Sequence, residues 1–588
     1  MASIPTGSLL SRLTRIVGDA FAASGADPAL GRVVVSNRPD LCDVQSNGAF
    51  AAAKALQKAP PEFANEVAER LRGNAAFRDV SVAGAYLNMT LSDALLMEES
   101  GERLEAIRAE SPLKIIIDYG GANVAKPLHV GHLRSAIIGE SLKRICRSLG
   151  HEVIGDVHLG DWGLQMGMIL HELSLRQPGL PYFAPGATGP FPEEAPVTLD
   201  ELDELYPSAS AKSKSDPEFL AASRQATALL QQGHPGYRAL WQNIVNLSVS
   251  DLRVDYGTLD VFFDLWYGES TVNDLLAPMV QKIIDDGFAY ESNGALVVDV
   301  AEASDKSEIP PLILQKSDGA VLYSTTDLAT IVLRVKETNP DLILYVIDKR
   351  QSLHLVQVYR AAWKTGIAPR TLQMEHIGFG TMNGTDGKPF KTRAGGTMKL
   401  KDLIQLVTER ASARIAEAEV AQDLSESERA EIARMVGIAT LKFADLSNTR
   451  IKDYVFDVDR FSSFEGRTGP YLLYTAVRAK SILRKAAERG FTAGALIAPR
   501  DEVERNVLLS LALLRDRVLA AFASRGPNEI ADYAYDLASL FARYYHEHHI
   551  LREEDEAVRA SSLELVQRAV TTLELALDLL GIEVPERM

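Results

Sequence analysis

The sequence predicts a multidomain α/β protein with a doubly wound parallel sheet of the Rossmann type at its centre, an N-terminal α+β domain and a C-terminal all-α helical bundle. Three observations predict this class. The chain has 588 residues, which is room for several domains at about 150 residues each. A strand, helix and strand pattern occupies residues 114–157, and helical periodicity is almost continuous from residue 403 onward.

Composition and charge exclude several classes of protein. Hydrophobic residues make up 46% and charged residues 24% of the chain, as in an ordinary globular protein, and no apolar run is long enough to cross a membrane. The formal charge of −17, from 62 basic and 79 acidic residues, argues against non-specific coating of nucleic acid. Any nucleic-acid partner must therefore bind at local basic patches.

The two cysteines, Cys42 and Cys146, are too few for a disulfide framework or a cysteine-based zinc site. The first residues, MASIPTGSLLSRL, lack the long apolar core of a secretory signal. We therefore expect a cytoplasmic protein in a reducing compartment. Cys146 falls on the apolar side of a predicted helix, where simple packing accounts for it.

The N-terminal domain is predicted to span residues 1–110. Residues 4–56 have a helical pattern, and residues 77–91, FRDVSVAGAYLNMTL, are typical of strands with a glycine turn. The segment is therefore a compact α+β unit, and its boundary falls near Glu110-Ser111-Pro112.

The central domain is predicted to span residues 111–445 and to begin with a right-handed βαβ unit. Residues 114–118, KIIID, form the short β-branched run of a buried parallel strand. A glycine-containing loop follows, then a helix with regularly spaced apolar residues that ends at Gly150, then a second strand at residues 153–157. Strand, helix and strand in succession indicate a doubly wound sheet.

An insertion divides the rest of this domain. Residues 178–216 are rich in proline, serine and alanine, so we place the insertion at about residues 170–310. Sheet-like patterns resume at residues 320–323, 342–347 and 375–381. Helices then dominate, and the C-terminal helical domain is predicted at residues 446–588, with its last helix closed by Gly581.

The chemistry is expected at His129-Val130-Gly131-His132, where the first strand feeds the crossover helix. Ligands of doubly wound sheets bind at that edge. Two imidazoles and the free N–H groups of the helix N-terminus would meet a docked anion there, and Gly131 leaves room for a flat base. The arrangement suits a nucleotide triphosphate, whose developing charge the imidazoles stabilise without proton transfer. In isolation such a tetrapeptide is often incidental, and two histidines at i, i+3 without a third ligand argue against a metal site.

A second signal is the flexible basic loop GKPFKTRAGG, at residues 387–396. It follows a strand-like segment, so it would lie at an edge of the sheet. A solvated surface loop is the alternative explanation of its charge.

These two segments resemble the signatures of class I aminoacyl-tRNA synthetases. With Lys126 just upstream, the first resembles the HIGH motif, and the second resembles the KMSKS loop, whose cations stabilise the pyrophosphate leaving group. Where the family pattern has its second lysine this chain has Ala394. The charge therefore comes from Lys388, Lys391 or Arg393, or from Lys126, which we favour for part of the role.

The resemblance implies residues that act on ATP. The catalytic residues that it implies are His129, His132, Lys126, Lys391 and Arg393. The contacts to ATP that it implies are His129, Gly131, His132, Lys388 and Thr392. ATP would arrive with Mg²⁺ as a substrate, with no protein cage for the metal and no tightly bound cofactor.

Over most of its length the chain resembles the arginyl-tRNA synthetases, a subgroup known for a degenerate second loop. Five segments carry this resemblance, in order: GGANVAKPLHVGHLRSAIIGE, HLGDWGLQMG, DGAVLYSTTDLA, PFKTRAGG and GIEVPERM. The arginine contacts that it implies are Asp118, Asn123, Tyr323, Asp327 and Gln351.

The chemistry of an arginine substrate agrees with two of these contacts. A guanidinium keeps its charge at neutral pH and presents a planar fork of donors, so its pocket needs carboxylates and oriented acceptors. Tyr323 and Asp327 stand at i, i+4 and share a face if Tyr323 opens a helix. Without the resemblance, Ser324, Thr325 and Asp327 are explained as helix caps, and turn chemistry is the alternative for the other three contacts.

Contacts to tRNA are predicted mainly in the last domain. Residues 471–490 carry five lysines and arginines against one glutamate, which suits phosphates and splayed loop bases. A solvated basic helix with core tyrosines is the alternative, and Asn88 is equally well explained as an ordinary strand-end residue. The contacts predicted or implied by the resemblance are Asn88, Tyr474, Arg478, Tyr544, Tyr545 and Met588.

The implied reaction has two in-line steps. The ionised α-carboxylate of L-arginine attacks the α-phosphorus of ATP and releases pyrophosphate. A terminal ribose hydroxyl of tRNA(Arg) then takes the arginine from the adenylate. The resemblance implies that tRNA binds before the first step, and we expect a monomer with no membrane partner.

Other functions fit parts of this pattern. A nucleotidyltransferase could share the HxGH motif but would not require the long helical domain. An inactive paralogue that binds RNA would be expected to lose His129, His132 or Asp327, and all three are present. Another class I synthetase is a further alternative, although one for cysteine would normally need zinc ligands.

Overall fold

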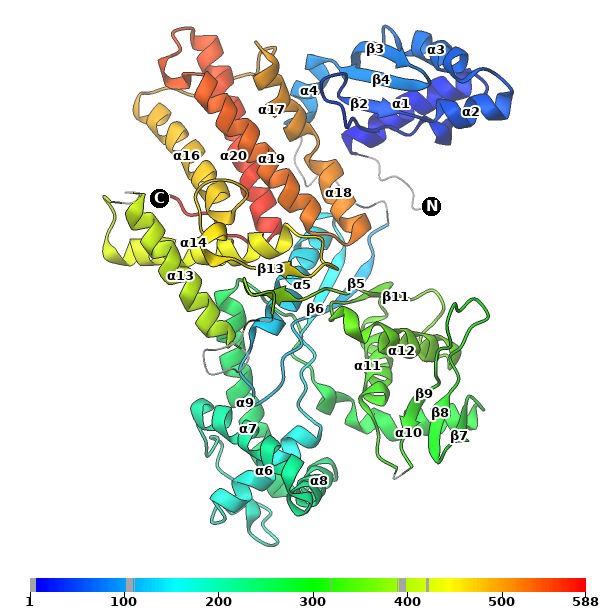
Figure 1. Cartoon of the computed structure of the whole chain (residues 1–588), viewed down its shortest axis with the longest axis vertical. Coiled ribbons are helices and arrows are strands. Elements are labelled where there is room, and N and C mark those ends of the chain that lie inside the picture. The colour runs from blue at the N-terminus through cyan, green and yellow to red at the C-terminus, as the bar shows by residue number, and fades with distance from the viewer. Residues whose placement is uncertain are drawn as a thin grey trace.

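The computed structural model of the chain describes residues 7–101, 109, 111–317, 319–388, 390, 398–418 and 422–588. Figure 1 shows a central sheet with a long helical domain on one side, a small N-terminal domain against that helical domain, and two lobes on the other side. The predicted multidomain α/β class is confirmed.

The N-terminal domain is an antiparallel sheet covered by helices. Its elements are α1 (Leu9–Ala23), η1 (Pro28–Gly31), β1 (Val34–Val35), β2 (Val44–Ser46), α2 (Ala49–Leu56), α3 (Pro60–Leu71), β3 (Phe77–Ala83), β4 (Tyr86–Leu91) and α4 (Asp93–Glu99). The paired strands β1 and β2 show that helix throughout residues 4–56 was a wrong prediction, since valines in both strands favour pleated pairing. β3 and β4 form the predicted hairpin, with Gly84 at φ +65° in its turn.

The central sheet has four parallel strands: β5 (Lys114–Asp118), β6 (Glu152–Asp156), β10 (Leu342–Tyr345) and β11 (Gln373–His376). They lie in the order β11, β10, β5, β6. The three isoleucines of β5 are at most 1% exposed, as in a parallel strand covered on both faces. The order of the strands reverses between β5 and β10, because β6 is added on one side of β5 and β11 on the far side of β10. A ligand crevice is therefore expected where β5 and β10 end.

Two lobes interrupt the sheet in sequence. The first is helical and contains α6 (Leu164–Arg176), η3 (Pro181–Phe183), α7 (Leu199–Ser215), α8 (Pro217–Gln231) and α9 (Pro235–Thr258). The second contains η4 (Glu269–Val272), α10 (Asn273–Asp285), β7 (Ala289–Ser292), β8 (Ala295–Val298), β9 (Leu312–Gln315), α11 (Tyr323–Thr338), η5 (Lys349–Gln351) and α12 (Ser352–Lys364). In Figure 1 they lie apart, below the central sheet.

The start of α11 differs from the prediction of a strand at residues 320–323. Val321 makes only an isolated bridge to Gln315, and helix follows directly. The hydroxyls of Ser324 and Thr325 donate to carbonyls of β9, at 2.7 and 2.6 Å, so side-chain hydrogen bonds dock the helix start on the small sheet.

The C-terminal part of the chain is helical, as predicted. Its helices are α13 (Leu400–Glu417), α14 (Glu426–Leu446), α15 (Val458–Phe461), α16 (Gly469–Glu488), α17 (Glu502–Ala512), α18 (Leu514–Ser524), α19 (Asn528–Glu547), η6 (Ile550–Arg552) and α20 (Glu556–Leu579). A short parallel pair, β12 (Met382–Asn383) with β13 (Tyr454–Val455), joins this part to the central domain. In the part of the chain that the structure describes, no helix is long and apolar enough to span a membrane.

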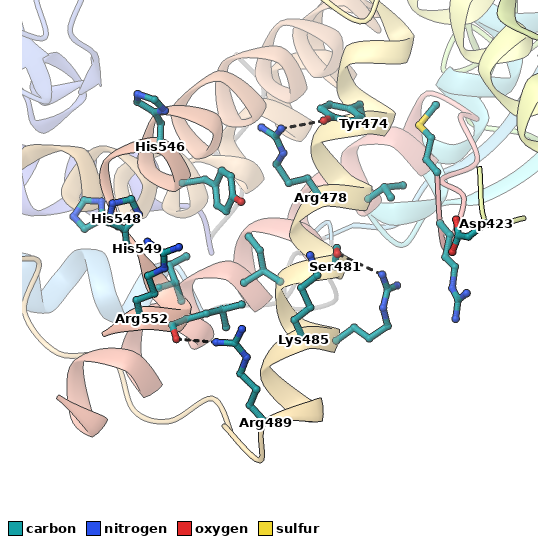
Figure 2. Close-up of a pocket in the computed structure, with 18 residues that line it drawn as sticks. Asp423, Tyr474, Arg478, Ser481, Lys485, Arg489, His546, His548, His549 and Arg552 are labelled. Atoms are coloured by element: carbon teal, nitrogen blue, oxygen red, sulfur yellow. Dashed lines mark hydrogen bonds between the residues drawn. The ribbon is translucent and has the colours of Figure 1, made fainter. Parts of the chain in front are cut away.

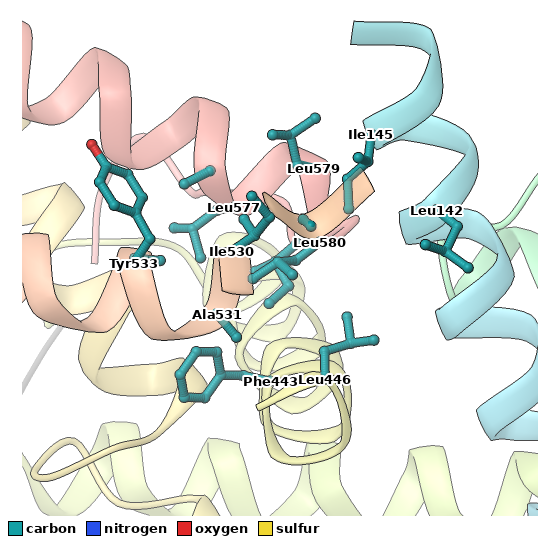
Figure 3. Close-up of a cluster of buried hydrophobic side chains, with 14 of the residues drawn as sticks. Leu142, Ile145, Phe443, Leu446, Ile530, Ala531, Tyr533, Leu577, Leu579 and Leu580 are labelled. Carbon is teal, nitrogen blue, oxygen red and sulfur yellow. The ribbon is translucent and has the colours of Figure 1, made fainter. Parts of the chain in front are cut away.

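The crossover helix α5 (Val130–Ser148) packs on the helical domain. Figure 3 shows Leu142 and Ile145 of α5 with Leu579 and Leu580, at the end of α20, in one cluster of buried side chains. Cys146 of the same helix is 1% exposed in this core, in agreement with a packing role. The helix that begins with the HVGH segment is therefore anchored at its other end by the C-terminal helix.

Arg144 of α5 links three parts of the chain beside this cluster. Its guanidinium pairs with Glu140 of α5 at 3.0 Å, with Asp260 after α9 at 2.8 Å and with Asp578 of α20 at 2.8 Å. Glu140 is almost completely buried, so its carboxylate depends on cationic partners for stabilisation.

We expect Arg144→Ala to lower the free energy of unfolding by about 2 to 3 kcal/mol, because it leaves a buried carboxylate with one cationic partner fewer. Urea denaturation followed by circular dichroism measures the change. Arg147→Ala is the matched control on the same helix, since its pair with Asp264 is 43% exposed on both sides and should contribute less than about 1 kcal/mol. Equal losses in the two variants would contradict this role of Arg144.

The N-terminal domain docks on the helical domain through a buried ion pair. Arg505 of α17 donates to the two carboxylate oxygens of Asp43 at 2.9 and 2.6 Å, and to the Leu91 carbonyl at 2.9 Å. Arg505 is 3% exposed. Moving the domains apart would leave a buried charge without its partner, which is energetically costly. The ion pair therefore holds the two domains in a defined relative position.

Candidate active site

Each histidine of the HVGH segment is held in one tautomer. His129 is the N-cap of α5, and its Nδ1 accepts a hydrogen bond from the Gly131 N–H at 3.0 Å. The Nδ1 of His132 accepts from the His129 N–H at 3.1 Å. Because each Nδ1 accepts, the proton of each neutral ring is on Nε2. The rings stack with centroids 3.9 Å apart, so the segment presents two Nε2–H donors side by side.

Both imidazoles are held neutral. Burial lowers the pKa of His132 from 6.5 to about 3, and the charges of His129 and Lys126 act in the same direction. Burial and Lys126 also lower the pKa of His129. Since these folded-state pKa values lie below the unfolded value, protonation favours the unfolded chain. The contribution of the two neutral rings to the free energy of unfolding is therefore complete above about pH 6.5 and decreases as the pH falls towards the folded-state pKa values. At neutral pH the pair therefore donates hydrogen bonds without carrying charge.

A cavity of about 450 Å³ opens beside these donors. Gly120 and Gly121, after β5, and Val346 and Ile347, after β10, line it at the carboxyl ends of the two strands. This is the point where the strand order reverses, the predicted place for a ligand. Further lining residues are His129, Gly131, His132, Gln351, Phe379 and Phe390.

Gly131 is required by the ring arrangement itself. A Cβ at this position would lie 2.7 Å from Cε1 and 2.9 Å from Nδ1 of His129. Any other residue would therefore displace the imidazole from its N-cap position. The structure adds this packing reason to the predicted space for a base.

The predicted arginine contacts Tyr323 and Asp327 lie one turn apart at the start of α11. Asp327 Oδ2 is hydrogen-bonded to Nε2 of His354 at 2.6 Å, and the Tyr323 and His354 rings lie 4.8 Å apart. The Asp327 side chain is 34% exposed, so it is accessible to a ligand. His354 lies in the first turn of α12, one turn after Gln351, which lines the cavity. Tyr323, Asp327 and His354 do not line the cavity themselves, so Asp327 is connected to it through His354 and the nearby Gln351.

Glu269 and His354 are two further polar residues here that the sequence did not indicate. Burial raises the pKa of Glu269 to about 6, His158 lowers it, and Asp161 and Asp327 raise it further. Glu269 thus shares an electrostatic environment with Asp327, although it lies on the separate segment η4. An acid whose pKa a second acid raises in this way would be stabilised as a carboxylate by a cation that bound near the two.

Asp118 ends β5 and Asn123 lies in the loop that follows, and neither residue lines the cavity. Arg334 of α11 donates to Asp118 at 2.7 Å and to Asp156 at 2.6 Å, and burial raises the pKa of Asp118 while Arg334 opposes the rise. Asn123 is half-buried and pairs through its backbone with Gly160. Asp118 thus already has a protein cation, and arginine binding by these two residues stays a prediction.

Most of the basic loop lies outside the described residues. Lys391, Thr392 and Arg393 belong to that part, so their predicted roles rest on the sequence. Lys388 is exposed on the turn that follows β12 and does not line the cavity. Lys126, by contrast, lies close enough to both imidazoles to lower their pKa values. Of the predicted cations that the structure describes, Lys126 is therefore the one near the imidazoles, although it does not line the cavity itself.

A second cavity, of about 660 Å³, lies in the helical domain (Figure 2). Arg478 donates to the Tyr474 hydroxyl at 3.0 Å and lies over the rings of Tyr474 and Tyr545, at 4.8 and 5.1 Å from their centroids. Met588 also lines it. The cations of the lining are Arg478, Arg484, Lys485, Arg489, Arg552 and Arg587. Exposed rings and cations together suit the bases and phosphates of single-stranded RNA.

Two predicted tRNA contacts are placed differently. Tyr544 is 0% exposed and packs in the core, whereas the next residue of α19, Tyr545, is 37% exposed at the cavity. The Tyr544 ring therefore offers no face to a base, and this tyrosine is a core residue in this structure. Asn88 is 6% exposed, and its Oδ1 accepts from Gln45 Nε2 at 2.7 Å, so its amide is already engaged.

Three family models match the chain in succession. Residues 9–91 match the arginyl tRNA synthetase N terminal domain, residues 91–458 match the model described as tRNA synthetases class I (R), catalytic domain, and residues 472–588 match the DALR anticodon binding domain. The catalytic-domain match alone covers more than half of the chain. The chain belongs to the arginyl-tRNA synthetase family. The predicted resemblance is confirmed.

Curated relatives of this family are similar over the whole length. The chain is 50% identical over 587 residues to an arginine--tRNA ligase of Alkaliphilus oremlandii and 48% identical over 589 residues to one of Hyphomonas neptunium, with 99% of this chain and 100% of each relative covered. Solved arginyl-tRNA synthetases share the fold. That of Plasmodium falciparum has a TM-score of 0.80 at 21% identity, with 100% of both chains covered, and that of Thermus thermophilus has 0.77 at 24%, with 99% and 100% covered.

Proposed function

We propose that this chain is an arginine--tRNA ligase, which activates L-arginine with ATP and transfers it to the 3′-terminal adenosine of tRNA(Arg). The observation that supports this most is the division of the cleft into two electrostatic parts. His129 and His132, with their neutral Nε2–H donors, line the cavity at the strand switch point, and the carboxyl of Asp327, which shares its electrostatic environment with Glu269, is connected to this cavity through His354 and Gln351. The first part suits phosphate oxygens and the second suits a guanidinium.

In the first step ATP occupies the 450 Å³ cavity, with Mg²⁺ carried on its phosphate oxygens. The arginine α-carboxylate is already ionised and attacks the α-phosphorus, so no general base is needed. As the bond to pyrophosphate breaks, the two Nε2–H donors and the Lys126 ammonium stabilise the increasing negative charge. Lys391 and Arg393 are proposed to assist from the basic loop.

In the second step a ribose hydroxyl of the tRNA attacks the adenylate carbonyl, and AMP leaves. The other end of the tRNA is proposed to meet the cavity of the helical domain, where Arg478 lies between Tyr474 and Tyr545. This cavity is lined by α16 and α19, both of which pack on α20, and α20 packs on α5, so packed helices connect the RNA cavity to the HVGH helix. This continuity supports tRNA binding before the first step.

Amino-acid-dependent exchange of pyrophosphate into ATP tests the proposal. We expect exchange with arginine, strengthened or made possible by tRNA(Arg), and no exchange with lysine, glutamine or cysteine. Exchange with glutamine or lysine but not arginine would assign the chain to another class I activity. ATP turnover that is independent of every amino acid would point to the nucleotidyltransferase alternative.

A further inference from the structure

One face of the insertion helix α7 contacts both segments that flank the nucleotide cavity. The Lys126 ammonium lies over the Tyr206 ring, 4.1 Å from its centroid. One turn earlier, Asp203 Oδ2 pairs with Lys399 Nζ at 2.7 Å. Asp203 and Tyr206 stand at i, i+3, so they are neighbours on the same face of α7. The helix thus contacts one lysine before the HVGH segment and one lysine after the basic loop.

These two lysines belong to chain segments that are paired next to the HVGH helix. The Val130 N–H donates to the Met398 carbonyl at 3.1 Å, and the Leu400 N–H donates to the Leu128 carbonyl at 2.8 Å. Lys399 is therefore held beside the start of α5 by backbone hydrogen bonds. Lys126, on the N-terminal side of the HVGH segment, is contacted by Tyr206 of the same helix α7.

The Lys126 ammonium has a defined place between the ring and the imidazoles. Within the described ranges, no carboxylate oxygen lies within 4.0 Å of the Lys126 Nζ. The Tyr206 ring is therefore the side chain that holds this ammonium in position. Its charge also lowers the pKa of both His129 and His132, in agreement with its place three residues before His129. A cation over an aromatic face is held in position without being neutralised, and it stays available to an anion.

We propose that Tyr206 is a positioning residue for ATP, which holds the Lys126 ammonium toward the β- and γ-phosphates from a helix outside the nucleotide-binding sheet. The inference deepens the proposed function and rests on it for the identity of the anion. Asp203 pairs with Lys399 on the same face of α7, so this helix contacts the segments on both sides of the start of α5.

Calorimetric titration with ATP and with AMP tests this directly. In Tyr206→Leu the ring is lost, and we expect ATP binding to weaken about fivefold to tenfold while AMP binding stays within twofold of wild type, because only ATP carries the phosphates that Lys126 meets. Tyr206→Phe keeps the ring and should bind ATP like wild type. Asp251→Asn is the matched control, since it removes a 2.9 Å pair between α9 and Lys401 and leaves Lys126 untouched.

The double variant decides whether Tyr206 acts through Lys126. In Lys126→Ala, the further change Tyr206→Leu should cost no ATP affinity, because the cation that the ring positions is absent. Equal weakening of ATP and AMP in Tyr206→Leu, failure of the phenylalanine variant to restore binding, or additive losses in the double variant would overturn the inference. If wild type shows no arginine-dependent exchange but these ATP and AMP results hold, the proposed function fails and the positioning role stands.

Discussion

Asp327→Asn is expected to lower kcat/KM for arginine in pyrophosphate exchange at least about 30-fold. The carboxylate is the acid at the start of α11, and it keeps a hydrogen bond to His354 at 2.6 Å in the free chain. An amide of the same shape removes the charge partner of the guanidinium, a loss of about 2 kcal/mol or more for one half of a desolvated pair. Because the Asp327 side chain is 34% exposed, solvent screens the pair and the loss should be about 2 kcal/mol.

Citrulline provides the control for charge in this experiment. Its urea group has the shape of a guanidinium and no charge, so wild type should prefer arginine strongly. In Asp327→Asn that preference should shrink, because the residue that discriminates charge is gone. If kcat/KM falls equally for arginine and citrulline, so that their ratio is unchanged, Asp327 maintains the structure of the site and does not bind the guanidinium.

His132→Asn is expected to lower the rate constant of exchange about 100-fold with little change in folding. The asparagine Oδ1 replaces Nδ1 and continues to accept from the His129 N–H, while the outward donor is lost. His132→Gln is the complementary variant, because its amide nitrogen takes the place of Nε2. We expect it to be at least about tenfold more active than the asparagine variant, and the reverse order would contradict the assigned tautomer.

The dependence on pH checks the same assignment. His132 has a pKa of about 3 in the folded chain, so the wild-type exchange rate should show no step from this ring between pH 5 and 7. A step with an apparent pKa near 6.5 that disappears in His132→Gln would show that the ring carries a proton during the reaction. Neutral hydrogen-bond donation would then be wrong.

The parts of the site that were predictable from the sequence are local ones. A β-branched run before a glycine loop predicted β5, and the HVGH segment marked the start of α5, since both patterns lie within a few residues. The four-residue spacing of Tyr323 and Asp327 likewise predicts one face of a helix, although the prediction of a strand at residues 320–323 was wrong. Neighbours in sequence are enough for such inferences.

Contacts between distant segments could not be predicted in this way. Glu269 and His354 join Asp327 only because η4 and α12 are brought to α11 by the fold, and no local pattern marks either residue. Tyr544 and Tyr545 are adjacent in sequence, yet the rotation of α19 buries the first and exposes the second. Which tyrosine faces the cavity depends on packing against the neighbouring helices, which composition does not specify.

A crystal structure with a non-hydrolysable arginyl-adenylate analogue tests the central claim most directly. The proposed division of the cleft predicts the adenosine in the cavity at the ends of β5 and β10, the phosphate within hydrogen-bond distance of Nε2 of His129 or His132, and the guanidinium between Asp327 and Glu269. A phosphate that lies away from both imidazoles, or a guanidinium that contacts neither acid, would contradict it.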